Sequence, residues 1–349
     1  MPRVAKPLPN KAPLNPMQAQ SLRETLLAWY AHNARPLPWR ETNDPYKIWL
    51  AEIMLQQTTV AAVIPYYERF LTALPTLQSL AQASIEDVLQ LWQGLGYYRR
   101  AHLLHRCAQT LVAQGGEWPR TAEDLQRLPG FGAYTAGAVA SCAFDTPALA
   151  IDGNVVRVIS RVLALNETIT HAHATLIAAT QAISEGAPPR PFTNALMELG
   201  SQVCTQKTPK CFLCPWQSEC KAFAQGEALN YPIKPRKKER PTKYGVAYVL
   251  RDTEGALWLQ QRPTEGLLGG LWELPHTGWE AHAPSLPTLP EDEQECGTIS
   301  HVFTHFTLVL EVRSGKVETI PATQRFTPES FPPLSTLMKK ALRCAGVKV

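Results

Sequence analysis

The sequence lacks the features that carry a chain into or across a membrane. It has no run of eighteen apolar residues, which excludes a membrane-spanning helix. Its first twenty residues have no apolar core and are neither amphipathic nor rich in Ser and Arg, so a secretory signal and an organellar transit peptide are also excluded. We therefore predict a protein of a bacterial cytoplasm.

Charge is scarce as well, since only 18% of the residues are charged and the net charge is +4. A value this small neither requires nor excludes a polyanionic partner, so binding to one must rely on local features. The clearest local excess lies in 231–243, where six basic residues and one acidic residue give +5. We interpret this Pro-rich stretch as an exposed linker between two domains.

The length of 349 residues predicts two domains. Residues 1–16 are rich in Pro and Lys without periodicity, which predicts a disordered tail. Residues 17–230 repeat apolar positions at helical spacing and predict an all-α domain. Residues 244–349 contain short runs of alternating or β-branched residues, with one helix near 335–344, and predict an α+β domain. The predicted fold class is therefore a multidomain chain, helical first and α+β second.

Disulfides are not expected in so long a chain without a signal peptide. Four of the eight cysteines nevertheless fall within seventeen residues, as Cys204-x6-Cys211-x2-Cys214-x5-Cys220, and we expect the other four to be buried thiols. Thiolates at this spacing can surround a zinc ion or an iron–sulfur cluster. Zinc sites more often combine two short knuckles, and only one is present, so the spacing favours a [4Fe–4S] cluster with a structural role.

A second motif, 128–137 (LPGFGAYTAG), joins a helical segment at 122–128 to a helix of small residues that begins near Thr135. The turn between them leaves unpaired backbone N–H groups at a helix start, where a phosphate can bind. Gly130 and Gly132 would let a DNA backbone approach closely. The motif is typical of a helix-hairpin-helix that binds nucleic acid without reading its sequence.

Two carboxylates lie in apolar surroundings. Glu52 falls within 48–55 (IWLAEIML), where burial would raise its pKa and suit it to act as a general acid, unless it pairs with an arginine. Asp152 precedes the apolar stretch 153–158, where its simplest role is to cap a helix. From the spacing alone, a helix cap is the favoured role of Asp152, and a buried pair with an arginine competes with acid catalysis for Glu52.

The order of these motifs resembles that in the helix-hairpin-helix DNA glycosylases with a cluster loop, the endonuclease III superfamily. Four segments narrow the resemblance to the adenine DNA glycosylase (MutY) family, namely 36–39 (PLPW), 45–49 (PYKIW), 52–58 (EIMLQQT) and 94–98 (GLGYY). The family implies a monomeric, nucleoid-associated enzyme of base excision repair. It would flip out and hydrolyse adenine mispaired with 8-oxoguanine or G in double-stranded DNA.

The resemblance also implies roles for individual residues. Glu52 would protonate adenine N7 and later help to activate water, while Asp152 would stabilise or trap the oxocarbenium ion. Tyr134 and Asn154 would support them. Tyr134 stands where bifunctional relatives carry a nucleophilic lysine, so hydrolysis without strand cleavage is implied. Further residues match positions that contact the flipped base or wedge into the duplex beside it: Arg35, Leu37, Arg40, Gln57, Tyr97 and Asn194, the last of which stands where relatives often have Gln or Glu.

The second domain resembles a Nudix fold through 266–275 (GLLGGLWELP). The Arg-Glu-x-x-Glu-Glu pattern of Nudix hydrolases has no match in 276–298, so pyrophosphatase activity is not expected. In the family, this domain reads 8-oxoguanine through a Phe-Ser-His loop, which is matched here by Phe303, Thr304 and His305. Thr304 keeps the hydroxyl group of the family's serine and adds a methyl group.

Two other classes of function are weighed against this one. A pyrimidine glycosylase with lyase activity would share the motifs, but Tyr134 argues against it. A protein that only binds damaged DNA, or senses redox state through its cluster, would share the cysteines. The pair of carboxylates argues against this third class.

Overall fold

The computed structural model describes residues 14–235, 239–282 and 293–349. Most of the predicted tail and part of the predicted linker lie outside these ranges. The last residues of the tail are described, and there the Asn15 side chain caps the first helix. The first strand begins at Thr242, inside the predicted linker. No helix in the described part of the chain is long and apolar enough to span a membrane.

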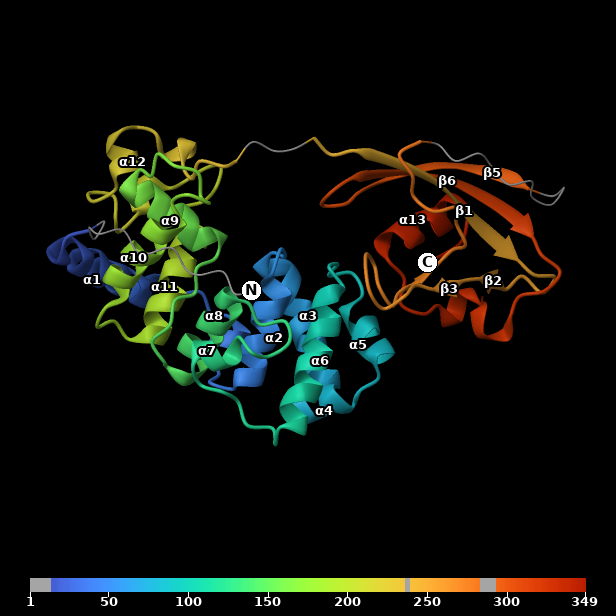
Figure 1. Ribbon diagram of the computed structural model, residues 1–349, viewed down its shortest axis with the longest axis horizontal. Helices are drawn as coiled ribbons and strands as arrows, with labels where there is room; N and C mark the ends of the chain where they lie inside the picture. The colour runs from blue at the N-terminus through green and yellow to red at the C-terminus, as the bar shows by residue number, and fades with distance from the viewer. Residues whose placement is uncertain (1–13, 236–238, 283–292) are drawn as a thin grey trace. The chain divides into compact units, whose positions relative to one another are not determined.

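Helices fill the first two thirds of the chain, and strands with one helix fill the last third (Figure 1). The α-helices of the first part are α1 (Pro16–Asn33), α2 (Pro45–Leu55), α3 (Val60–Ala73), α4 (Leu77–Gln82), α5 (Ile85–Trp92), α6 (Arg99–Ala113), α7 (Ala122–Leu125), α8 (Ala133–Phe144), α9 (Gly153–Leu163), α10 (His173–Ser184), α11 (Pro189–Gln202) and α12 (Lys221–Ala224). The last part contains β1 (Thr242–Arg251), β2 (Leu257–Trp258), β3 (Gln260–Gln261), β4 (Trp272–Glu273), β5 (Gln294–Val302), β6 (Thr307–Lys316), β7 (Arg325–Phe326) and α13 (Thr336–Cys344). The predicted fold class is confirmed.

Local signals account for several boundaries. Asp152 caps α9, and Ser335 caps α13, each by accepting backbone N–H groups of the first turn. The helix predicted over 122–128 is too long, because α7 ends at Leu125 and the chain continues through tight turns to Pro129. Pro129 disfavours helical backbone at Leu128, the residue before it, so a helix is not expected to continue to 128.

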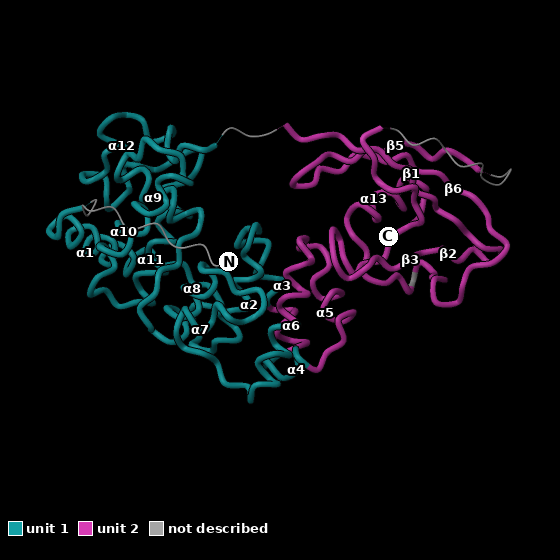
Figure 2. The backbone as a smooth tube through the Cα atoms, in the orientation of Figure 1, with its two compact units in different colours: residues 1–67, 75–81, 106–236 teal, residues 68–74, 82–105, 237–349 magenta. Residues whose placement is uncertain are grey.

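The chain divides into two compact units, coloured separately in Figure 2. The first comprises residues 1–67, 75–81 and 106–236, and the second comprises 68–74, 82–105 and 237–349. Two helical segments thus group with the C-terminal residues. The domain boundary at the linker therefore stays a prediction from the sequence.

The first unit is organised around a core shared by α1, α9, α10 and α11. Leu22, Ile159 and Leu199 are fully buried there, together with Trp216 from the loop that carries the clustered cysteines. The indole of Trp216 donates a 2.7 Å hydrogen bond to the carbonyl oxygen of Leu22. This bond holds the cysteine loop against the helical core.

The C-terminal residues of the second unit form a five-stranded mixed sheet in the order β5-β6-β1-β2-β7, with β1 and β6 parallel and the other pairs antiparallel. Leu310 and Val312 of β6 are buried against Leu337 and Met338 of α13. A hairpin joins β5 to β6 at the end of the sheet where β1 begins. The predicted Phe303-Thr304-His305 segment forms its turn.

Candidate functional site

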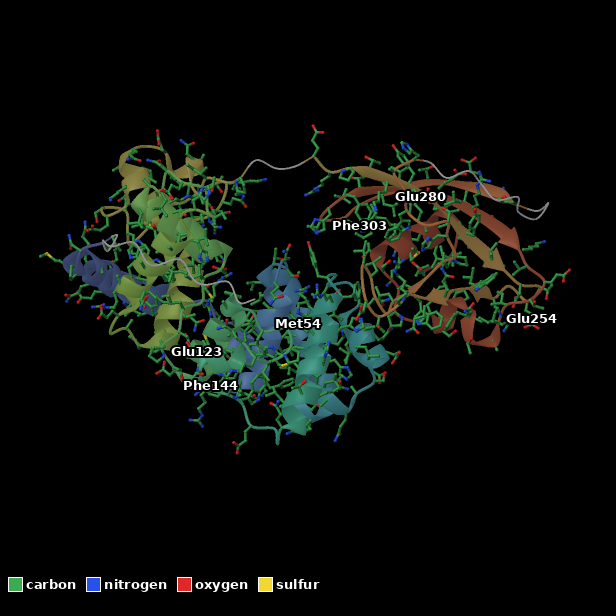
Figure 3. The ribbon with its side chains drawn as sticks, viewed as in Figure 1. Met54, Glu123, Phe144, Glu254, Glu280 and Phe303 are labelled. Carbon is green, nitrogen blue, oxygen red and sulfur yellow. The ribbon has the colours of Figure 1, made fainter. Side chains whose placement is uncertain are left out.

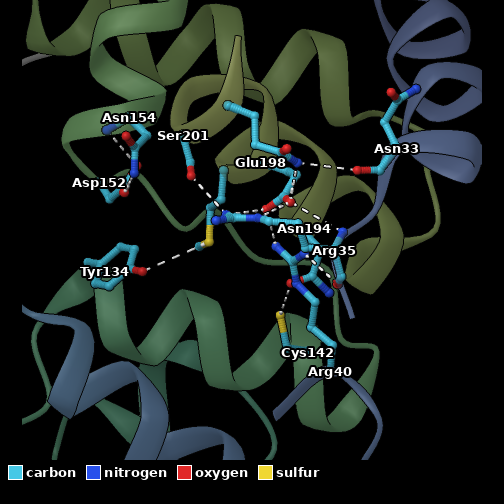
Figure 4. Close-up of polar contacts among 12 residues, drawn as sticks. Asn33, Arg35, Arg40, Tyr134, Cys142, Asp152, Asn154, Asn194, Glu198 and Ser201 are labelled. Atoms are coloured by element: carbon cyan, nitrogen blue, oxygen red, sulfur yellow. Dashed lines mark hydrogen bonds and ion pairs between the residues drawn. The ribbon is translucent and has the colours of Figure 1, made fainter. Parts of the chain in front are cut away.

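A cleft of about 560 Å³ opens in the first unit between α2, α8, α9 and α11. It is large enough for a nucleobase and its sugar. Figure 4 shows several of its polar side chains converging from these helices. The structure brings eight of the residues named from the sequence together in its lining: Arg35, Leu37, Arg40, Glu52, Tyr134, Asp152, Asn154 and Asn194.

Glu52 lies on α2, a helix that is buried on nearly every side. Its carboxylate accepts a 2.7 Å hydrogen bond from the Tyr134 hydroxyl of α8. Burial raises the pKa of Glu52 to about 7, the bond from Tyr134 acts to lower it, and the charge of Asp152 acts to raise it. The described residues give Glu52 no salt bridge with an arginine, so it can hold a proton near neutral pH.

Asp152 both caps α9 and faces the cleft. Its Oδ1 accepts the backbone N–H groups of Asn154 and Val155 at 2.9 and 2.8 Å, and its Oδ2 accepts the Asn154 side chain at 2.6 Å. Burial raises the pKa of Asp152, while these donors act to lower it. Because Oδ2 accepts one hydrogen bond here, it keeps a lone pair for another partner. Asp152 can therefore cap α9 and also contact a ligand in the cleft.

Asn154 is held in place by a contact that requires glycine. A Cβ on Gly200 of α11 would come within 2.6 Å of the Asn154 Cβ. Arg157 then bonds Asn154 Oδ1 at 2.7 Å and the carbonyls of Gly200 and Cys204 at 2.6 and 2.7 Å. The start of α9 is therefore tied both to α11 and to the cysteine loop.

Glu198 is a cleft residue that the sequence analysis missed. Its side chain, on α11, is 1% exposed and forms ion pairs with Arg35 and Arg40, as Figure 4 shows. Burial acts to raise the pKa of Glu198, but hydrogen bonds from Arg35 and Arg40 outweigh it and hold the pKa below its ordinary value. A signal was present, because Glu198 stands among apolar residues (ALMELG) just as Glu52 does.

The glycine-rich turn precedes α8. Gly130 has a φ of 80°, which favours glycine, and Gly132 is the N-cap of α8 without any side-chain cap. A Cβ on Gly132 would meet nothing within 4 Å, so the fold itself does not require glycine there. The uncapped N–H groups of α8 are available to an anion.

Two residues predicted to wedge into a duplex have unusual backbone conformations. Gln57 follows α2 with a φ of 61°, and Tyr97 precedes α6 with a φ of 50°. Neither is glycine, so each position stores strain of about 1 kcal/mol, which is characteristic of functional sites. The Tyr97 side chain is 49% exposed, and its ring lies 5.6 Å from the guanidinium of Arg100.

The clustered cysteines neighbour one another. The pKa of Cys214 is raised to about 12, chiefly by burial. A hydrogen bond from the Trp216 backbone acts to lower this pKa, and the neighbouring Cys204, Cys220 and Cys211 act to raise it. Among the described residues, no three His, Cys, Asp or Glu side chains converge tightly enough for a single metal ion. Four neighbouring cysteine thiols are the kind of ligand set that holds an iron–sulfur cluster.

A buried cation beside these thiols supports a negatively charged group there. Arg161 is 2% exposed and donates to Cys204 Sγ at 3.3 Å and to the carbonyl oxygens of Thr205 and Tyr231 at 2.8 and 3.2 Å. No carboxylate of the described residues pairs with it. A buried guanidinium needs a negative partner, and thiolates around a cluster would provide one.

The four remaining cysteines are of two kinds. Cys107 and Cys142 are buried, as expected. The expectation is wrong for Cys296 and Cys344, which are partly exposed because β5 and the end of α13 border the solvent.

Comparison with known proteins identifies the family. The model of the HhH-GPD superfamily base excision DNA repair proteins matches residues 50–180, and that of the NUDIX domain matches 246–344. The adenine DNA glycosylase of Rattus norvegicus is 38% identical, over 93% of this chain and 77% of its own length. That of Homo sapiens is 36% identical, over 93% of this chain and 74% of its own length. The chain belongs to the adenine DNA glycosylase family.

The fold of the helical part agrees with this membership. A thermostable thymine-DNA glycosylase superposes with a TM-score of 0.55 at 28% identity, over 60% of this chain and 98% of its own. An endonuclease III in complex with DNA has the same fold, with a TM-score of 0.51 at 23% identity. The chain is thus an adenine DNA glycosylase by family, an N-glycosyl hydrolase with a Nudix-like domain after its glycosylase domain.

Proposed function

We propose that the chain removes adenine from 8-oxoguanine:A and G:A mispairs in double-stranded DNA by hydrolysing the bond between base and sugar. The observation that carries this proposal is the unequal pair of carboxyl groups in one cleft. Glu52 has a pKa of about 7 and a single hydroxyl donor, whereas Asp152 accepts three N–H groups. Two carboxyl groups in different environments can divide acid catalysis and cation stabilisation between them.

Glu52 supplies the proton. With a pKa of about 7, it is protonated in about half of the molecules at neutral pH, so it can donate to N7 of a flipped adenine. Protonation makes the base a neutral leaving group. After the bond breaks, Glu52 is ionised and can accept a proton from the attacking water. Tyr134 orients the carboxyl group through its 2.7 Å hydrogen bond.

Asp152 stabilises the positive charge that develops on the sugar. The donors on its two oxygens favour the carboxylate form and fix its direction, and the free lone pair on Oδ2 faces the developing cation or forms a bond to C1′. Its negative charge also helps Glu52 to keep its proton. No residue of the described cleft lining is a lysine, in accord with hydrolysis without a Schiff base.

Contacts to the base and the duplex come from other parts of the chain. Arg35, Leu37, Arg40 and Asn194 line the cleft that would receive adenine. Gln57 and Tyr97 would fill the gap that base flipping leaves, and the amides after Gly130 and Gly132 would bind the DNA backbone. In the second unit, Thr304 and His305 are exposed at their turn, where a lesion could be read.

Cys204, Cys211, Cys214 and Cys220 would hold one [4Fe–4S] cluster. When bound, it would cross-link the loop that Trp216 and Arg161 attach to the helical core. Each step of the hydrolysis described above is performed by residues of the cleft. Iron and acid-labile sulfide near four of each per chain are the expected contents, and zinc in their place would contradict the assignment.

The test is a single-turnover excision assay on duplexes that carry adenine opposite 8-oxoguanine, G, C or T. We expect release of free adenine in the order 8-oxoguanine, then G, with little opposite C or T. Borohydride should trap no protein on the DNA, because no amine attacks the sugar. A covalent adduct with a pyrimidine substrate, or tight binding to the mispair without excision, would establish one of the other two classes.

A further inference from the structure

We propose that Trp279 is a positioning residue that holds the Phe303-Thr304-His305 turn in the geometry that recognises 8-oxoguanine. The proposal rests on the function proposed above, because it concerns how the second unit reads the lesion. Trp279 lies far from the glycosylase motifs in the sequence and outside the segments that carry the family resemblance.

The turn is small and has few supports of its own. It is closed by a 2.9 Å hydrogen bond from the Phe303 N–H to the Phe306 carbonyl oxygen. Thr304 and His305 between them are exposed, so they are free to meet a ligand but contribute little packing. The phenylalanines on either side are half-buried, and their rings lie 4.8 Å apart. Whatever fixes these two rings therefore fixes the turn.

Trp279 contacts both rings, whereas His301 contacts Phe303 at 4.6 Å and the Lys243 ammonium lies 5.0 Å from the centre of the Phe306 ring. The Trp279 ring is stacked on Phe303 at 5.6 Å and 26°, and it contacts Phe306 at 6.1 Å and 48°. On its other side it stacks on His276, also at 5.6 Å and 26°. His276, Trp279 and Phe303 thus form a continuous aromatic series that ends at the turn. Figure 3 shows Phe303 at the end of the sheet opposite Glu254.

The far end of the series is anchored in the sheet. The backbone N–H of Gly278 donates to His276 Nδ1 at 2.9 Å, so the proton lies on Nε2, which donates to the buried Glu273 at 3.1 Å. Glu273 also pairs with Arg262, whose guanidinium lies 5.1 Å from the centre of the Trp279 ring. The ion pair of Arg262 with Glu273 and the hydrogen bond of His276 therefore hold the two groups that contact this side of the Trp279 ring.

Strand β1, which lies beside the segment that carries Trp279, leaves room for the Trp279 ring. Gly245 of β1 has no side chain, and a Cβ there would lie 2.5 Å from the Gly278 carbonyl oxygen and 3.1 Å from the Trp279 ring. The segment 276–280 can therefore lie beside β1 as an antiparallel neighbour, and the backbones of Tyr244 and Glu280 each donate a hydrogen bond to the other. The Trp279 Nε1 is buried and has no partner among the described residues, so only the ring, and no polar bond, fixes this side chain.

The experiment uses the full-length protein and four forms of it: wild type, Trp279→Ala, Trp279→Phe and Trp272→Ala. Excision and duplex affinity are measured with adenine opposite 8-oxoguanine and opposite G. Trp272 is the matched control because it lies in the same domain and packs on Phe326 at 4.7 Å, away from the turn. Hydrogen exchange of the Phe303 amide, measured in the protein without DNA, reports how stably the hydrogen bond that closes the turn is formed.

We expect Trp279→Ala to lower the preference for 8-oxoguanine over G about tenfold and to leave G:A excision unchanged, since lost stacking is of this size. Exchange of the Phe303 amide should become faster. Trp279→Phe keeps a ring and loses no hydrogen bond, so it should restore the preference. Trp272→Ala should change neither the preference nor the exchange.

The proposal is overturned if Trp279→Ala keeps the wild-type preference, lowers both activities equally, or leaves exchange of the Phe303 amide unchanged. It is also overturned if Trp272→Ala has the same effect. A wild-type enzyme without any preference for 8-oxoguanine would instead contradict the proposed function, and the exchange of Phe303 would still show whether Trp279 holds the turn.

Discussion

Glu52 and Glu198 lie in the same cleft, and both are almost completely buried, but their pKa values shift in opposite directions. Glu52 meets a tyrosine hydroxyl and the charge of Asp152, and its pKa rises to about 7. Glu198 meets two guanidinium groups, and its pKa falls below the ordinary value. Burial acts alike on the two carboxyl groups, so their neighbours decide the outcome.

The two sides of the cleft therefore suit different tasks. On the Glu52 side, an uncompensated carboxyl group holds a transferable proton and lowers stability at neutral pH. On the Glu198 side, a carboxylate whose pKa is lowered accepts hydrogen bonds from both Arg35 and Arg40 and holds them in fixed positions. We infer that one carboxyl group performs chemistry and the other shapes the place where adenine binds.

Removing the proton donor is expected to have the largest effect. Glu52→Gln should lower single-turnover excision of adenine about 10³-fold or more, because an amide cannot protonate the base. The variant should bind the mispair as the wild type does, which a gel-shift titration checks. Retention of excision within tenfold of the wild type would show that Glu52 is not the acid.

The same substitution should stabilise the fold at high pH. A carboxyl group whose folded pKa is raised from 4.5 to about 7 reduces stability increasingly between those values, and the loss is complete above pH 7. We expect Glu52→Gln to be about 3 kcal/mol more stable than the wild type at pH 8 and nearly equal to it at pH 4.5, by urea denaturation. Glu123→Gln, which replaces an exposed carboxyl group by the same amide, is the matched control. A gain that is independent of pH would argue against a raised pKa at Glu52.

Glu198 should show the opposite behaviour. Glu198→Gln leaves Arg35 and Arg40 without their charge partner, and we expect a loss of about 2 kcal/mol at pH 7, moderated because Arg35 is one-third exposed. Because the folded pKa is lowered, the stabilising effect of Glu198 is present above pH 4.5 and is lost as pH falls through the folded pKa. The difference between variant and wild type should therefore shrink in acid. Equal stability at pH 7 would contradict the role given to this ion pair.

The hydrogen bond from Tyr134 should have the smallest effect. Tyr134→Phe removes a donor that lowers the pKa of Glu52, so the pKa should rise further and the acid should stay protonated to higher pH. The descending limb of the pH–excision profile should move to higher pH, with less than a tenfold change in rate at pH 7. A limb that stays in place or moves to lower pH would show that the hydroxyl does not act on Glu52.

Much of the fold could be predicted because its signals are local. Helical periodicity, the Asp152 cap and the spacing of the four cysteines each depend on residues within about two turns or one loop of one another. The end of the helix predicted over 122–128 is wrong. The apolar pattern continues to Leu128, but Pro129 disfavours helical backbone at the residue before it.

The cleft is formed by residues that are distant in the sequence, so local signals do not predict which of them meet. Its residues were named from a resemblance, but Glu198 was not among them, although Arg35 and Arg40 were. Arg35 and Glu198 are separated by 163 positions, and no periodicity connects them. Likewise, the left-handed backbone of Gln57 and Tyr97 depends on surroundings that sequence patterns do not report.

By itself, the sequence determined that a helical domain precedes an α+β domain, that four thiolates can gather in one loop, and that a carboxyl group enters an apolar helix. These outcomes depend on near neighbours along the chain. Only the tertiary structure decided that the pKa of Glu52 is raised and that of Glu198 is lowered, and that Trp279 stacks on the turn at Phe303. The physical reason is that a pKa and an aromatic contact depend on groups that meet in space, and folding brings these together from distant positions.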